Sequence, residues 1–163
     1  MGRLTCTPST MVVMTRLRYT ETQMNLTKKI AIVTGGSSGI GRAIAESLIS
    51  AGSHVTITGR DQAKLEAAAA EIGAQAVRAD VSNEQDVKRT YQTVLEKFGD
   101  LNILVNNAGI GVFKPLVDMD LASFERVFAT NVTGAMLMGR EAAKLFVARK
   151  GGHIVNIAST ASL

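Results

Sequence analysis

The sequence reads IAIVTGGSSGIG from Ile30 to Gly41, an apolar run of strand length followed by spaced glycines. A strand that turns into a helix through glycines is typical of a loop that holds phosphate groups. Gly35 allows the tight turn, Gly39 lets the main chain approach a pyrophosphate, and Gly41 lets the helix pack against the sheet. The phosphates would face the positive end of the helix dipole and the amides of Ser37, Ser38, Gly39 and Ile40.

Two other classes of nucleotide site fit this stretch less well. Arg42 follows Gly41, so the Gly-Lys-Ser/Thr of a Walker loop does not occur here. A methyltransferase would place an acid at the end of the second predicted strand, where this chain has Gly59 and Arg60. The glycine loop therefore favours a dinucleotide site.

Short β-rich runs alternate with helical patterns from Lys28 onward, which is typical of βαβ units and a parallel sheet. Strands are predicted near 29–34, 54–58, 75–79, 101–106 and 153–158. Helices are predicted near 39–51, 61–72, 83–98, 121–129 and 131–149, with N-caps at Asp61 and at Ser82 or Asn83, and stops at Gly52, Gly73 and Gly99. The predicted fold class is α/β, a doubly wound parallel sheet of the Rossmann type. Its first strand is central, and a ligand crevice lies at the carboxyl ends of the strands.

Composition limits the classes of protein. At 163 residues, with 46% hydrophobic and 20% charged residues, the chain fits a single α/β domain. Its longest apolar runs fall well short of the roughly 20 residues that span a bilayer, so no membrane association is expected. The single Cys6 cannot form an internal disulfide, and two separated histidines form no ligand cluster, so no metal site is predicted. The net charge of +4 comes partly from the first residues, and nucleic acid is not expected as a partner.

Residues 1–27 show neither a strand nor a helix period, and we interpret them as a leader or disordered tail before a dinucleotide-binding domain at 28–163. Their arginines and threonines, with no acid until Glu21, are similar to a transit peptide, but the amphipathic pattern is weak. A tail is the preferred interpretation, with Met24 as an alternative start. A cytoplasmic protein is therefore predicted, with organellar import as the alternative.

The residue after the second predicted strand decides between NAD and NADP. Arg60 stands there, and its guanidinium can pair with a 2′-phosphate, whereas a carboxylate would bind the 2′-hydroxyl of NAD. NADP is therefore predicted over NAD. The alternative is that Arg60 is a solvated loop residue and Asp61 meets the ribose, although Asp61 also suits the N-cap of its helix. Asp80 and Val81, after the third strand, lie where an adenine edge could be bound, and Asp80 is equally suited to a turn.

Polar residues also follow the later strands, and taken alone they favour structural roles. Asn106 and Asn107 end an apolar strand, where side-chain amides can bond neighbouring backbone groups. Asn131 opens a helical pattern and could be its N-cap. Ser159 follows the last predicted strand, where a serine is usually a turn residue.

At these positions the chain resembles the short-chain dehydrogenase/reductase family, from about Lys28 to its last residue. The family's cofactor signature matches Thr34-Gly35-x-x-x-Gly39-Ile40-Gly41, and its second signature matches Asn106-Asn107-Ala108-Gly109. Two signatures in order and at fitting separation are hard to obtain by chance. The resemblance implies hydride transfer between a nicotinamide cofactor and an alcohol or carbonyl substrate.

The resemblance also implies roles for single residues. The stretch with Asn107, Ala108 and Gly109 is expected to stabilise the sheet beside the nicotinamide ribose, where the two small residues leave room for the ring. Asn131 is expected to help hold a water in a proton relay. Ser159 is expected to hydrogen-bond the substrate carbonyl and is the strongest catalytic candidate.

One element of the family is missing from these residues. In the family a Tyr is the general acid and base, with a Lys one helical turn later, downstream of the Ser. Tyr19 and Tyr91 are followed four positions on by Gln23 and Leu95, so neither forms that pair. The sheet is therefore expected to be incomplete on its C-terminal side, the chain alone to be inactive, and much of the family's homo-oligomer interface to be missing. The alternatives are an NADP-binding module without activity and a nonfunctional fragment.

Overall fold

The structure is a computed structural model that describes residues 25–159. The predicted leader at 1–27 lies almost wholly outside these residues, as do Cys6, Tyr19 and Met24, so the domain boundary at 28 stays a prediction. Strands and helices alternate along the described chain: β1 (Ile30–Thr34), α1 (Gly39–Ser50), β2 (His54–Gly59), α2 (Gln62–Ile72), β3 (Gln75–Arg78), α3 (Glu84–Phe98), β4 (Ile103–Asn106), the 3-10 turn η1 (Leu116–Asp118), α4 (Leu121–Phe128), the π-helical segment η2 (Ala129–Gly134), α5 (Ala135–Ala148) and β5 (His153–Asn156).

The five strands form one parallel sheet in the order β3-β2-β1-β4-β5. The chain winds outward from β1 to β3 and then returns to continue on the other side of β1 with β4 and β5, so the winding reverses between β1 and β4. In open α/β sheets ligands bind at the carboxyl ends of the strands at such a reversal. The predicted fold class, the strand positions and the central first strand are confirmed.

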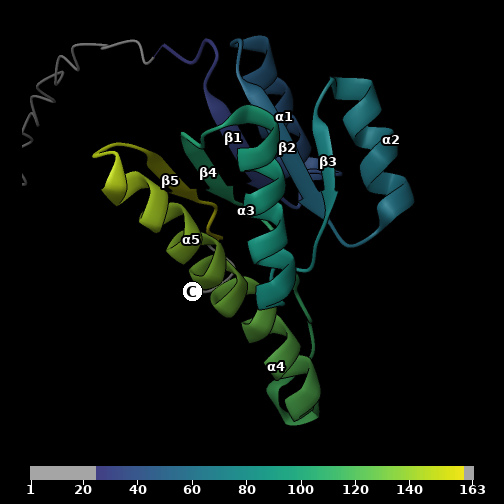
Figure 1. Cartoon of the computed structure of the whole chain (residues 1–163). Helices are drawn as coiled ribbons and strands as arrows, with labels where there is room; N and C mark the ends of the chain where they lie inside the picture. The colour runs from purple at the N-terminus through teal and green to yellow at the C-terminus, as the bar shows by residue number, and fades with distance from the viewer. Residues whose placement is uncertain (1–24, 160–163) are drawn as a thin grey trace, which may run out of the picture.

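Helices cover both faces of the sheet, with α3 and α5 on one face and α1 and α2 on the other (Figure 1). Alternate residues of β1 point to opposite faces and supply both cores. Val33 packs with Leu65 of α2 on one face, and Ile32 packs with Val94 and Met138 on the other. Because β1 is buried on both faces, its sequence is an unbroken apolar run instead of an alternating one.

The predicted ends of α2 and α3 are confirmed. The carboxylate of Asp61 accepts the amide of Lys64 at 3.1 Å and caps α2, and the side chain of Asn83 caps α3. Gly73 and Gly99 end these helices in the left-handed conformation, with φ of 74° and 79°.

The helix predicted at 131–149 does not begin at Asn131. α4, η2 and α5 follow one another without a break, because Phe128 and Ala129 keep helical backbone angles. An N-cap needs an extended backbone at the start of a helix, and Asn131 lies inside η2, so its interpretation as an N-cap is wrong. The cap at the start of this long helical run is Asp120, whose carboxylate accepts the amide of Ser123 at 2.7 Å.

β5 forms one edge of the sheet. All its residues are exposed, and the apolar side chains of Ile154 and Val155 are 41% and 44% exposed. Within the described chain this edge has no strand beyond it, so the sheet is open on the side where incompleteness is predicted.

Two further findings concern residues 25–159 alone. None of their helices combines the length and the apolar character needed to cross a membrane. No group of three or more His, Cys, Asp or Glu side chains among them is arranged to hold a metal ion.

Candidate functional site

A wide cleft of about 1170 Å³ opens at the carboxyl ends of β1, β4 and β5, where the winding of the sheet reverses. The predicted site residues that line it are Ile40, Val81, Asn107, Ala108, Gly109, Asn131 and Ser159. The other predicted site residues belong to the segments that follow β1, β2 and β3, and they are Gly35, Ser37, Ser38, Gly39, Gly41, Arg60 and Asp80. The structure therefore brings the predicted set to one end of the sheet.

The loop after β1 presents main-chain amides that have no acceptor in the described part of the chain. Within residues 25–159 no bond is made by the amides of Ser37 to Ile40, whereas Gly36 donates to the Thr58 carbonyl at 3.1 Å. α1 begins at Gly39, so the unpaired amides lie at the positive end of its dipole. Gly39 has a φ of 55°, and a Cβ built on it would have no atom within 4 Å. The loop thus has the amides, the helix dipole and the open side that an anion site needs.

The remaining glycines of the loop are packed against the protein. A Cβ at Gly36 would lie 2.5 Å from Cγ2 of Ile57, and a Cβ at Gly41 would collide with Nδ2 of Asn107. The packing role of Gly36 could not be predicted from the sequence, because its neighbour Ile57 lies on β2 and only the strand order brings the two together. These glycines serve packing, whereas Gly39 faces open space.

Thr34 ties the end of β1 to the end of β4. Its hydroxyl is buried, accepts the amides of Asn107 and Ala108, both at 2.9 Å, and donates to the Val105 carbonyl at 3.3 Å. Asn107 completes this junction, since its Nδ2 donates to the carbonyls of Thr34 at 2.9 Å and Gly35 at 3.3 Å. Asn107 therefore holds the glycine loop in place. Thr34 is a positioning residue whose role does not follow from the sequence motif alone.

Asn106 joins β4 to two later elements. Its Nδ2 donates to Oδ1 of Asn156 on β5 at 2.9 Å and to the Ala135 carbonyl of α5 at 3.2 Å. Its own Oδ1 is buried and has no partner among the described residues. A buried acceptor of this kind is usually satisfied by an ordered water. The structural role expected for Asn106 agrees with these bonds.

Asn131 fixes the segment that follows β4. Its Oδ1 accepts the amide of Ile110 at 2.9 Å, and its Nδ2 donates to the carbonyl of the same residue at 2.9 Å. π-Helical turns often occur at functional sites, and η2 places Asn131 opposite this segment. At the end of η2, a Cβ on Gly134 would lie 2.6 Å from Cγ2 of Val81. The wall of the cleft is therefore held by the middle of η2, at Asn131, and by its last residue, Gly134.

Replacing Asn131 by alanine should release Ile110. The amide of Ile110 loses a hydrogen bond that contributes about 1 kcal/mol net, so we expect it to exchange with solvent about fivefold faster. Hydrogen exchange followed by NMR measures this rate. The amide of Lys64, which Asp61 holds away from the cleft, is an internal control. Equal exchange of Ile110 in the variant and the original chain would contradict the clamp.

Asp80 closes the turn before α3. Its Oδ1 accepts the amide of Ser82 at 2.9 Å and the hydroxyl at 2.7 Å, and its own amide donates to Oδ2 of Asp86 at 2.9 Å. That bond from the Asp80 amide is the main cause that lowers the pKa of Asp86, and the ion pair with Arg89 lowers it further. These contacts support the role of Asp80 as a turn residue. Its other carboxylate oxygen, Oδ2, has no partner among residues 25–159.

Arg60 and Asp61 follow β2 at the corner of the sheet next to β3. The side chain of Arg60 is exposed, whereas the carboxylate of Asp61 is engaged as the cap of α2. The expected capping role of Asp61 agrees with this contact, and the side chains of both residues are exposed.

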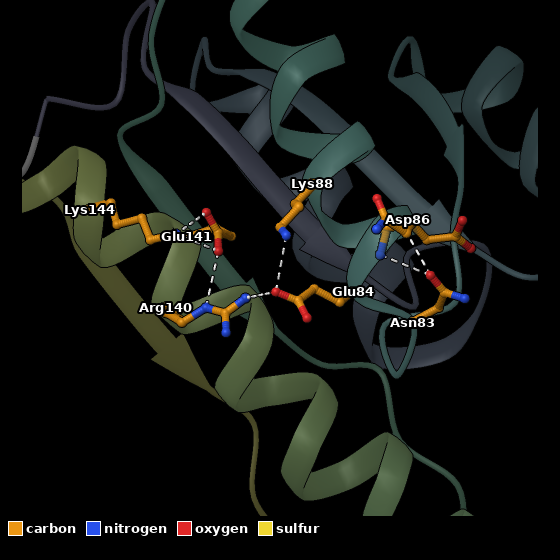
Figure 2. Close-up of polar contacts among 8 residues, drawn as sticks. Asn83, Glu84, Asp86, Lys88, Arg140, Glu141 and Lys144 are labelled. Carbon is orange, nitrogen blue, oxygen red and sulfur yellow. Dashed lines mark hydrogen bonds and ion pairs between the residues drawn. The ribbon is translucent and has the colours of Figure 1, made fainter.

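A polar network joins the first turn of α3 to α5 (Figure 2). Nη2 of Arg140 donates to Oε1 of Glu84 at 2.6 Å, and Nζ of Lys88 lies 3.2 Å from the same oxygen. These bonds, that of Arg140 first, lower the pKa of Glu84. Arg140 also pairs with Glu141 at 3.1 Å, and Glu141 pairs with Lys144 at 2.8 Å. The network therefore fixes the start of α3, and the turn before it, against α5.

Tyr91 is the tyrosine that the structure describes, and it lies in the core. It is 5% exposed, its hydroxyl donates to the Met138 carbonyl at 2.5 Å, and burial raises its pKa. A general acid must reach the proton that it transfers, and Tyr91 does not line the cleft. This agrees with the prediction that Tyr91 is not the tyrosine of the family motif.

Comparison with known proteins gives consistent matches. The family profile described as short chain dehydrogenase matches residues 29–163. The sorbitol dehydrogenase of Cereibacter sphaeroides and the galactitol 2-dehydrogenase of Agrobacterium fabrum are each 38% identical over 141 residues, which covers 85% of this chain and 55% of each relative. A crystal structure from Agrobacterium tumefaciens, provisionally named a gluconate dehydrogenase, has a TM-score of 0.78 and 41% identity, covering 83% of this chain and 55% of that one. The chain thus spans about half the length of the curated relatives that it matches.

Proposed function

The chain belongs to the short-chain dehydrogenase family, and on that premise we propose that it is the cofactor-binding part of an NADP-dependent oxidoreductase. The proposed reaction is hydride transfer between a nicotinamide and an alcohol or carbonyl substrate. The observation that carries the proposal is the set of unpaired amides from Ser37 to Ile40 at the start of α1. Together with the open face of Gly39, they fit a pyrophosphate in charge, direction and space.

In this proposal each loop at the carboxyl edge holds one part of the dinucleotide. Arg60 binds the 2′-phosphate, which favours NADP over NAD. Asp80 and Val81 contact the adenine, and Ala108 and Gly109 leave room for the nicotinamide ribose. Asn107 holds the glycine loop in place, because its side chain donates to the carbonyls of Thr34 and Gly35 at the start of that loop. The cofactor, when bound, supplies or accepts the hydride.

The substrate side of the proposal rests on Ser159 and Asn131, which both line the cleft. Ser159 would donate its hydroxyl to the substrate carbonyl, and the turn around Asn131 would hold the water of a proton relay. Residues 1–163 contain no Tyr-x-x-x-Lys pair to act as acid and base. We therefore propose that this polypeptide alone binds cofactor without appreciable turnover. The proposed location is the cytoplasm.

Cofactor binding by the whole 163-residue chain tests the proposal. Titration with NADPH, followed by the fluorescence of its reduced nicotinamide, should saturate, and the Kd for NADH should be at least about tenfold higher, because a charge-assisted bond to the 2′-phosphate is lost. Isothermal calorimetry with both dinucleotides gives the two constants. A flat signal with both would reject the proposed function.

Turnover needs a separate measurement. Because a positioned acid and base contributes about 10²–10⁴ in rate, NADPH oxidation with a panel of aldehydes and ketones should not exceed that of the Ser159→Ala variant. A higher rate in the original chain would overturn the proposed inactivity and leave the cofactor assignment standing.

A further inference from the structure

Two arginines at the carboxyl ends of β2 and β3 form no ion pair with a carboxylate of the described chain. Neither Arg60 nor Arg78 has an Asp or Glu oxygen within 4.0 Å among residues 25–159. Arg89 beside them is paired, with Asp86 at 2.7 Å. Both unpaired side chains are exposed, so the corner presents two cations to a ligand.

Arg78 lies beside Arg60 and on the side of the phosphate loop. Its Nε donates to the Arg60 carbonyl at 3.1 Å, and Arg89 donates to the Arg78 carbonyl at 3.0 Å. Arg78 pairs with Gly59 in the ladder between β2 and β3, so its side chain leaves the sheet on the face where a side chain at 59 would. A Cβ built on Gly59 would lie 3.5 Å from Oγ of Ser37. Arg78 therefore shares a face with the loop that holds the phosphates in the proposed function.

The chemistry of this corner suits a phosphate group better than a hydroxyl. A guanidinium that spends its Nε–H on a carbonyl keeps both Nη groups, which can bind two oxygens of one phosphate. Two neighbouring cations repel each other, and a bound dianion removes that repulsion. A ribose hydroxyl carries no charge and would leave the repulsion in place.

We propose that Arg78 is a second specificity-determining residue, which binds the 2′-phosphate of NADP together with Arg60. This inference rests on the proposed function, in which the glycine loop binds a dinucleotide. The bond from Arg78 to the Arg60 carbonyl holds the segment that carries Arg60, so the two residues lie next to each other. If Arg78 only braced that segment, its loss would weaken phosphorylated and unphosphorylated ligands alike.

Binding of two small probes by the 163-residue chain tests the inference. Adenosine 2′,5′-bisphosphate carries the 2′-phosphate and 5′-AMP does not, and isothermal calorimetry gives both affinities. The original chain should bind the bisphosphate at least about tenfold more tightly. The affinity of Arg78→Ala for the bisphosphate should be about tenfold lower, and its affinity for 5′-AMP should be unchanged. Arg78→Lys should fall between the two, because it keeps the charge but not the planar fork.

Arg126→Ala is the matched control, since Arg126 is an exposed arginine of α4 that also has no carboxylate within 4.0 Å in the described chain. It should bind both probes like the original chain. An unchanged ratio of affinities in Arg78→Ala, or an equal loss on both probes, would overturn the inference. Equal binding of both probes by the original chain would overturn it as well and leave a dinucleotide site in place. If neither NADPH nor NADH binds, the proposed function fails and the inference fails with it.

Discussion

Replacing Gly39 by alanine should weaken NADPH binding by about 100-fold while the chain stays folded, because at least one charge-assisted bond to the phosphates is lost. The Cβ of the variant lies in open space next to the loop amides, with no other atom of the described chain within 4 Å. It would occupy the space that a pyrophosphate needs to reach the amides of the loop. An alanine at a φ of 55° costs about 1–2 kcal/mol, which lowers the free energy of unfolding but leaves the fold intact.

Gly139→Ala is the matched control for this prediction. Gly139 lies inside α5, and a Cβ built there also has no atom within 4 Å. Its backbone is helical, so the change should raise the free energy of unfolding by about 0.5–1 kcal/mol and leave the Kd for NADPH unchanged. Calorimetric titration and urea unfolding of both variants separate binding from stability. The interpretation of the loop as an anion site would be contradicted by a Gly39→Ala variant that binds NADPH as tightly as Gly139→Ala.

Most of the fold could be predicted because its signals are local. The central strands are buried on both faces, so they read as apolar runs, and Asp61 and Gly73 mark the ends of α2 within its own sequence. The passage from α4 to α5 could not be predicted in this way. The segment η2 ends at Gly134, which packs against Val81, a residue far away in the chain.

In the candidate site, too, local roles could be predicted from the sequence and long-range contacts could not. Gly39 is predictable because its role is a property of its own backbone. The roles of Gly36 and Arg78 cannot be predicted in this way, because each depends on a neighbouring part of the fold. Gly36 packs against Ile57 of β2, and Arg78 binds the segment that carries Arg60. The sequence motif shows which residues surround a phosphate loop, but the strand order decides which of them are near each other.

Replacing Thr34 by valine should lower the free energy of unfolding by about 3 kcal/mol, the largest effect on stability that we expect. The two side chains have similar volume, so the change leaves no large cavity. It removes the acceptor for the amides of Asn107 and Ala108, and an unsatisfied buried group costs about 1–3 kcal/mol. The Val105 carbonyl also loses the donor that lies 3.3 Å away.

Thr34→Ser separates the hydroxyl from the rest of the side chain. It keeps the acceptor and removes one buried methyl group, so it should cost only about 1 kcal/mol. Urea unfolding gives the free energy of unfolding of both variants, provided that their m-values are unchanged. NADPH titration should show weaker binding for Thr34→Val alone, because the junction also positions the loop that begins at Gly35. If the two variants unfold at the same urea concentration, the hydroxyl does not hold the ends of β1 and β4 together, and the rigidity of the loop must come from the packing of Gly36 and Gly41 instead.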